Sequence, residues 1–216
     1  MPLLVVYNPV CGSRSAKSLT EDLILPLLYQ CNVTVDLVVA TKHAGHVGEL
    51  IADYLRSTVD LTLILVSGDG TLHEVVNNRN ITENQATKEY RVDRPPVQIS
   101  VVLVPAGTAN ALYSSLFPPA KGEASTVEYK LKSLKAFLDG KEGVPLSLGV
   151  TTLLPPAGEE SQTPSRTVVS GVVTSTALHA SILYDSEKLR HEYPGIKRYF
   201  CHMLNERMST EVCFEI

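Results

Sequence analysis

Residues 61–77 read LTLILVSGDGTLHEVVN, a stretch that passes from an apolar run through a glycine turn into an amphipathic segment. The run at 61–66 is typical of a strand in a parallel sheet that is covered on both faces. The glycines at 68 and 70 break the strand, and apolar residues then recur at helical spacing. The stretch therefore predicts a strand, a turn and a helix, the repeating unit of an α/β fold.

The same unit recurs along the first two thirds of the chain. Apolar, β-branched runs predict strands at 3–7, 33–40, 61–66 and 97–104. Amphipathic stretches predict helices at 18–29, 44–56 and 124–138, with Pro26 kinking or shortening the first and Gly140 ending the last. The alternation predicts an α/β domain with a parallel sheet and right-handed crossovers.

Composition limits the classes of protein to consider. The 216 residues are 44% hydrophobic and 19% charged, which excludes extensive disorder, and the net charge of −4 argues against a nucleic-acid-binding protein. No secretory signal and no apolar stretch of ~20 residues is present, which predicts a soluble cytoplasmic protein. The four cysteines lack metal-ligand spacing and are expected to be reduced thiols: Cys11, Cys31, Cys201 and Cys213.

The pattern changes after residue 142. Strand-like runs at 145–153 and 167–175 flank a proline-rich loop at 154–166, and no long helix separates them. We therefore predict a nucleotide-binding domain at 1–142 and a β-rich second lobe at 143–216. The second lobe is expected to be truncated, and the polar stretch at 78–96 is expected to be an exposed loop.

Three glycine turns follow successive predicted strands: Asn8-Pro9-Val10-Cys11-Gly12-Ser13, Ser67-Gly68-Asp69-Gly70-Thr71 and Pro105-Ala106-Gly107-Thr108-Ala109-Asn110. Ligands of open α/β sheets bind beyond the carboxyl ends of the strands. Glycine lets the backbone approach a bulky anion, and free N–H groups at helix starts bind phosphate. One such turn is ordinary turn chemistry, whereas three at one edge favour nucleotide binding.

The second turn carries two polar side chains with possible roles. Asp69, between two glycines, suits a general base or a magnesium-linked carboxylate. Because no bulky neighbour adjoins it, we expect its side chain to contribute little to the fold. Thr71 has a structural alternative, the N-cap of the helix that carries His73 and Glu74.

The three turns together resemble the signatures of the diacylglycerol kinase catalytic-domain family, which includes sphingosine and ceramide kinases. The decisive stretches are Asn8-Pro9-x-x-Gly12, the run from Ser67 to Asn77, and the run from Pro105 to Asn110. Residues 178–190 also resemble the start of the second lobe in the sphingoid-base and ceramide branch. The resemblance implies a Rossmann-like domain of the phosphofructokinase and NAD kinase type, followed by a β-sandwich lobe. It also implies an ATP- and Mg²⁺-dependent lipid kinase that acts peripherally on intracellular membranes.

The resemblance also implies roles for individual residues. Catalytic roles fall on Asp69, which would accept the lipid hydroxyl proton or order Mg²⁺, and on Glu74, which would support that site. The residues expected to bind the nucleotide and its phosphates are Asn8, Gly12, Ser13, Gly68, Gly70, Thr71, Gly107, Thr108 and Asn110. These parts match phosphoryl transfer, which needs positioning and charge neutralisation more than covalent chemistry.

The sequence departs from the family pattern at several places. Asn78 stands where many members carry glycine, and Ser181 and Leu183 stand where sphingosine kinases place acidic residues that meet the lipid amine. No further acidic glycine turn follows Arg190. The acceptor class therefore stays open among diacylglycerol, ceramide and sphingoid bases.

Two other functions remain alternatives. One is a truncated, non-catalytic nucleotide-binding module that acts through protein contacts, and the other is an NAD kinase-like enzyme. The motifs at Asn8-Pro9 and at 105–110 disfavour the second. His43 and His46 resemble a metal pair but lack a third ligand, so they are interpreted as capping or solvated side chains.

Overall fold

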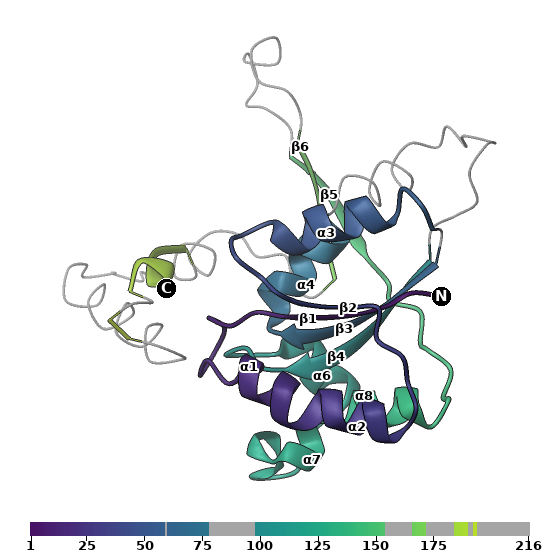
Figure 1. Cartoon of the computed structure of the whole chain (residues 1–216). Helices are drawn as coiled ribbons and strands as arrows, with labels where there is room; N and C mark the ends of the chain where they lie inside the picture. The colour runs from purple at the N-terminus through teal and green to yellow at the C-terminus, as the bar shows by residue number, and fades with distance from the viewer. Residues whose placement is uncertain (59, 78–97, 154–165, 172–183, 190–191, 194–216) are drawn as a thin grey trace, which may run out of the picture. The chain divides into compact units, whose positions relative to one another are not determined.

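The computed structural model describes residues 1–58, 60–77, 98–153, 166–171, 184–189 and 192–193 (Figure 1). Packing divides the chain into two compact units, Met1–Val172 and Val173–Ile216. In the second unit, residues 184–188 are helical, and the Lys188 ammonium lies 2.7 Å from the Asp185 carboxylate. The sheet and the site described below belong to the first unit.

Several sequence predictions concern residues outside the described set. These are the loops at 78–96 and 154–165, together with Asn78, Ser181, Leu183, Cys201 and Cys213. The domain boundary predicted after residue 142 also stays a prediction.

A parallel sheet of four strands forms the centre of the first unit. The strands are β1 (Leu3–Tyr7), β2 (Leu37–Ala40), β3 (Asp60–Ser67) and β4 (Gln98–Pro105), in the order β2-β1-β3-β4. The register aligns Val5 with Val38 on one side and with Ile64 on the other, and Ile64 with Val102. The predicted α/β class and parallel sheet are confirmed, although β2 begins four residues later than predicted.

Helices cover both faces of this sheet (Figure 1). On one face, α3 (His46–Tyr54) and α4 (Asp69–Val76) bury Val47, Ile51 and Leu72 against alternate residues of β1 and β3. On the other face, the segments α1 (Ala16–Ser18), η1 (Leu19–Ile24), α2 (Leu25–Gln30) and α8 (Lys132–Leu138) form a second apolar cluster around Ile24, Leu28 and Leu134. This two-sided burial explains why the strands are almost wholly apolar.

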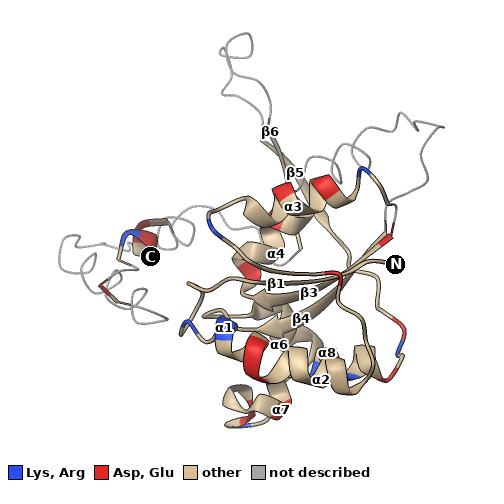
Figure 2. Ribbon diagram, viewed as in Figure 1, with Lys and Arg blue, Asp and Glu red and all other residues tan. Residues whose placement is uncertain are grey.

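Among the described residues, the charged ones lie mainly on helices and loops, and Asp60 is the one charged residue of the four sheet strands (Figure 2). Within the part of the chain that the structure describes, no helix has the length and apolar character needed to cross a membrane.

The first helical segment runs further than predicted. It comprises α1 (Ala16–Ser18), the π-helical η1 (Leu19–Ile24) and α2 (Leu25–Gln30). Pro26, which has no N–H to donate, is the second residue of α2 and comes directly after the π-helical turn. The π turn before it, in which the Leu25 N–H bonds to the Thr20 carbonyl, lets the helix continue to Gln30.

The predicted helix at 124–138 is three shorter pieces. They are η2 (Glu123–Ser125), α7 (Val127–Lys130) and α8 (Lys132–Leu138). The Thr126 hydroxyl caps α7 by accepting from the Tyr129 N–H at 3.2 Å, which starts a new helix at that point. Gly140, with φ +68°, follows the end of α8, as the sequence predicts.

An antiparallel hairpin follows, made of β5 (Gly149–Leu153) and β6 (Arg166–Ser170). Strands were expected at 145–153 and 167–175. β5 begins four residues later than expected, β6 begins one residue earlier, at the last residue of the predicted loop, and residues 172–175 lie outside the described set. The hairpin belongs to the first compact unit, where buried Val169 packs in the cluster formed by α3, α4 and the sheet. The β-sandwich lobe itself stays a prediction.

Candidate functional site

The turns after β1, β3 and β4 lie side by side at one edge of the sheet, because these strands are neighbours with the same direction. Backbone hydrogen bonds extend the ladders into the turns. The Asn8 N–H donates to the Val66 carbonyl at 3.1 Å, and the Ala106 N–H donates to the Ser67 carbonyl at 2.9 Å. The structure thus brings the three predicted turns together where open α/β sheets bind ligands.

Three glycines allow these turns to touch. A Cβ on Gly12 would lie 2.3 Å from the Ala106 carbonyl oxygen, and its φ of +48° already favours glycine. A Cβ on Gly107 would lie 2.4 Å from the Gly68 Cα. Gly70 differs, because nothing lies within 4 Å of the position its Cβ would take. Gly12, Gly68 and Gly107 therefore serve contacts within the protein, whereas Gly70 faces open space.

Two asparagines that were predicted to bind the nucleotide use their side-chain amides to order the turns. Asn8 accepts from the Val10 N–H at 3.1 Å and donates to the Thr71 hydroxyl at 3.2 Å. Asn110, with φ +51°, accepts from the Gly107 N–H and donates to the Gly107 carbonyl, both at 2.9 Å. Both asparagines therefore order the turns, and their contact with a nucleotide stays a prediction.

The Asp69 carboxylate bridges two helices. It belongs to the first turn of α4, and it accepts from the N–H groups of Ala111 at 2.8 Å and Leu112 at 3.2 Å. These groups open α6 (Ala111–Leu116), so Asp69 caps a helix far away in the sequence. These two contacts argue against the expectation that Asp69 contributes little to the fold, because its partners come from tertiary packing rather than from its neighbours in the chain.

The N-cap of α4 is Gly68, in an extended conformation, and not Thr71. Thr71 is the third residue of the helix and is buried, and its hydroxyl accepts from Asn8. The alternative that Thr71 caps this helix is therefore wrong. Its hydroxyl instead joins the second turn to the first.

Three other predicted site residues lie outside this set of contacts. The Ser13 hydroxyl is exposed and donates to the Ser15 hydroxyl at 3.2 Å, and Thr108 is half-buried in the third turn. Glu74 lies on α4, roughly 140° around the helix from Asp69. Asp69 lines a small, mainly apolar pocket with Leu72, and Glu74 is not among its lining residues. Their roles stay predictions.

The sequence profile described as Diacylglycerol kinase catalytic domain matches residues 2–137, which contain all three turns. The chain belongs to this family. Its relatives are lipid kinases.

Among curated proteins, the chain is 25% identical over 205 residues to Sphingosine kinase 1 of Arabidopsis thaliana, covering 92% of this chain and 37% of that protein. It is 30% identical over 146 residues to human Sphingosine kinase 1, covering 68% and 35%. It thus spans well under half the length of these relatives. A solved structure described as a putative diacylglycerol kinase from Bacillus anthracis has a TM-score of 0.45 and 19% identity, covering 70% of this chain and 42% of that one.

The residues present fit the nucleotide and the metal that a kinase domain of this family implies. The Thr71 N–H already bonds to the Gly68 carbonyl at 3.2 Å, but the N–H groups of Asp69 and Gly70 come before the first helical carbonyls of α4. Gly70 is open, which lets a phosphate approach these two groups. Among the described residues, no cluster of three His, Cys, Asp or Glu could hold a metal. Kinase Mg²⁺ needs only one or two carboxylates besides phosphate oxygens, so Asp69 fits this pattern.

The histidine pair, interpreted from the sequence as capping or solvated side chains, makes local contacts. The rings of His43 and His46 lie 5.0 Å apart, and the Nδ1 atom of His46 accepts from the Lys42 N–H at 3.2 Å. The His43 Nε2 atom lies 3.7 Å from the exposed Glu49 carboxylate. Both side chains thus have local partners near the start of α3.

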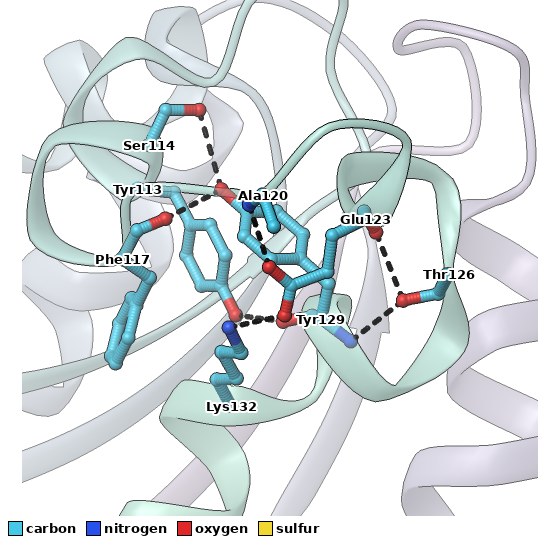
Figure 3. A network of polar contacts seen from close by, with 8 residues as sticks. All are labelled: Tyr113, Ser114, Phe117, Ala120, Glu123, Thr126, Tyr129 and Lys132. Carbon is cyan, nitrogen blue, oxygen red and sulfur yellow. Dashed lines mark hydrogen bonds and ion pairs between the residues drawn. The ribbon is translucent and has the colours of Figure 1, made fainter.

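A polar network holds the other end of α6 in place (Figure 3). The Tyr113 hydroxyl donates to the Tyr129 carbonyl, and the Tyr129 hydroxyl donates to the Phe117 carbonyl at 2.9 Å. Burial raises the pKa of Tyr113 to about 12, so the hydroxyl stays protonated. The nearby Lys132 ammonium bonds to the Glu123 carboxylate and lowers the pKa of that carboxyl. Asp69 and this network together fix both ends of α6.

Two contacts were not predicted from the sequence: the capping of α6 by Asp69, and the contact between Asn77 and Val169 described below. The first pair is 42 residues apart and the second 92. No local pattern signals such contacts.

Proposed function

We propose that this chain is the nucleotide-binding part of a lipid kinase, which transfers the γ-phosphate of ATP to a lipid hydroxyl. The acceptor is of the diacylglycerol, ceramide or sphingoid-base type, and the sphingosine kinases among the relatives support the last of these. One observation carries the proposal. Three glycine turns meet at the carboxyl edge, with the Asp69 carboxylate among them and Gly70 open to a ligand.

The chain's own groups divide the work as follows. The backbone at Gly68 and Gly70 would hold the phosphates, and the N–H groups of Asp69 and Gly70 at the start of α4 would bind their oxygens. A carboxylate offers about four lone-pair sites, so Asp69 retains acceptor capacity beyond the two N–H groups of α6. It accepts the proton of the lipid hydroxyl as the oxygen attacks phosphorus. Bound Mg²⁺ neutralises charge on the phosphate oxygens.

A lipid acceptor lies in a membrane surface, and the protein therefore acts there as a peripheral enzyme. The second lobe is the part proposed to meet the lipid. Asn8, Thr71, Asn110 and Gly107 keep the turns in register. A supporting role for Glu74 rests on the family resemblance alone.

The nucleotide site is tested by the thermal midpoint of the chain in MgATP. A ligand at 100 times its Kd adds about 2.7 kcal/mol to the free energy of unfolding, so the midpoint rises. Gly70→Val places a branched side chain in the open space and abolishes this rise. Gly143→Val is a matched control, since Gly143 also has nothing within 4 Å of its Cβ position and lies after α8. An unchanged midpoint in millimolar MgATP refutes the nucleotide site.

Catalysis is tested by radiolabel transfer from ATP to vesicles that contain diacylglycerol, ceramide or a sphingoid base. Transfer to one lipid identifies the acceptor class. A midpoint that rises with MgATP, together with no transfer to any of the three lipids, supports the non-catalytic module. The non-catalytic module stays a second candidate function because Asp69 caps α6, a structural role that needs no catalysis.

A further inference from the structure

Asn77, at the C-terminal end of α4, hydrogen-bonds to a single residue of the hairpin. Its Oδ1 atom accepts from the Val169 N–H at 2.9 Å, and its Nδ2 group donates to the Val169 carbonyl at 2.6 Å. One amide thus satisfies both backbone groups of a residue 92 positions away. The same Nδ2 group lies 3.0 Å from the His73 carbonyl of its own helix.

The geometry of the hairpin explains why these two backbone groups are available. Val169 lies opposite Val150 in an antiparallel pair. In such a pair, alternate residues direct both their N–H and C=O groups away from the partner strand. Asn77 supplies the donor and acceptor that a further strand would have provided.

The contact is specific because an apolar anchor accompanies it. The Val169 side chain is 3% exposed and packs in the cluster that includes Leu72, Val75 and Val76 of α4. The amide contact thus lies beside a buried one, and the two together fix the position of β6 on α4.

The same short helix begins at the candidate nucleotide site. Gly68 and Asp69 form its N-terminal end, and Asn77 is its C-cap. Because helical hydrogen bonds connect these ends, a ligand that orders the first turn also favours the arrangement at the last.

We propose that Asn77 is a positioning residue that fastens the β5–β6 hairpin to α4 and couples its order to nucleotide binding. The fastening stands on the contacts alone, and the coupling rests on the proposed function. By linkage, a hairpin held by Asn77 also favours nucleotide binding to the same degree.

The fastening is tested with Asn77→Asp, which keeps the size of the side chain but replaces the donor by a carboxylate oxygen. At neutral pH this carboxylate oxygen faces the Val169 carbonyl oxygen, and the two acceptors repel each other. We therefore expect amide hydrogen exchange in β6 to be faster than in the wild type by a factor of roughly ten or more. A protonated carboxyl has one O–H donor and one carbonyl acceptor, enough to bond the C=O and N–H groups of Val169 as the amide does. The exchange rate of β6 in Asn77→Asp, compared with the wild type at the same pH, should therefore return toward the wild-type rate as the carboxyl is protonated. The pKa of an aspartate ordinarily lies at about 3.9.

Two variants serve as controls. Asn77→Ala has no titratable group, so its β6 amides exchange faster than the wild type at every pH. Asn32→Asp makes the same change of charge at an exposed position with φ +55°, and it leaves β6 unchanged. Wild-type exchange in Asn77→Asp at neutral pH, or an increase that acid does not reverse, overturns the fastening role.

The coupling is tested by repeating the exchange measurement with MgATP. In the wild type, MgATP slows exchange in β6, whereas in Asn77→Ala it raises the thermal midpoint without slowing β6. Equal slowing in both proteins overturns the coupling. A wild type whose midpoint ignores MgATP refutes the nucleotide site and the coupling with it, while recovery of Asn77→Asp in acid still establishes the fastening.

Discussion

Replacing Asp69 by asparagine tests whether this residue holds the fold as well as serving the chemistry. In the structure both carboxylate oxygens accept N–H groups from the first turn of α6, at 2.8 and 3.2 Å. An asparagine side chain has one acceptor oxygen, so its NH₂ group must face the second N–H. The change therefore removes one charge-assisted hydrogen bond, weakens the other, and removes a negative charge from the N-terminal ends of α4 and α6.

The magnitude follows from these losses. A hydrogen bond to a charged group contributes about 1.5–3 kcal/mol when buried, and less here because the Ala111 contact is exposed. A carboxylate at a helix N-terminus adds about 0.3–1 kcal/mol. We expect Asp69→Asn to lower the free energy of unfolding by about 2 kcal/mol, which corresponds to a fall in midpoint of roughly 4–8 °C for a chain of this size.

Urea unfolding followed by circular dichroism measures this change, with Asp22→Asn as the control. Asp22 is exposed on η1, so its substitution removes the same charge at little cost. A loss below about 0.5 kcal/mol in Asp69→Asn, within the range of ordinary surface substitutions, would refute the capping role. Lipid transfer by this variant must be assayed well below its midpoint, so that lost activity reports on chemistry. Full transfer there would remove Asp69 from the catalytic assignment.

Three further changes test the packing of the turns and the network beside them. Gly12→Ala places a Cβ against the Ala106 carbonyl and should lower the free energy of unfolding by about 2 kcal/mol or more. Gly45→Ala is the control, also at positive φ but in open space, and should lower it by about 1 kcal/mol. Equal losses for the two variants in urea unfolding would contradict the close contact. Thr71→Val keeps the buried volume but removes the acceptor for Asn8, which should cost about 1 kcal/mol, and wild-type stability would argue against that bond. Lys132→Met should raise the pKa of the Glu123 carboxyl toward about 4.3 by NMR titration. The pKa of Glu123 is lowered in the folded protein, so its contact with Lys132 stabilises the fold above the ordinary pKa of a glutamate. This stabilisation is lost as the pH falls through the pKa of the folded protein. An unshifted Glu123 pKa in Lys132→Met would show that Lys132 does not act on this carboxyl.

Much of the fold follows from local patterns. Apolar β-branched runs predict β1, β3 and β4 to within one residue at their ends, because strands buried on both faces tolerate few polar residues. The order of strands and helices predicts the parallel sheet, and the parallel sheet places the three glycine turns at one edge. Gly140 ends its helix as predicted, since a residue with positive φ is a local requirement.

Local patterns fail where an element depends on what surrounds it. Pro26 was expected to kink or shorten its helix. The helix instead continues to Gln30, with a π turn before the proline and with Ile24 and Leu28 buried. The β2 strand begins at Leu37 rather than at residue 33, because pairing with β1 decides its length.

The partners of the polar side chains were decided by tertiary structure alone. Glycine spacing indicated that Asp69 lies at a turn, but only the packing of α6 shows that the carboxylate also caps a helix. Asn77 ends the second motif, and only the folded hairpin brings Val169 to its amide. Hydrophobic periodicity is written along the chain, whereas a hydrogen bond between distant residues depends on the angles at which whole elements pack, which no short stretch of sequence encodes.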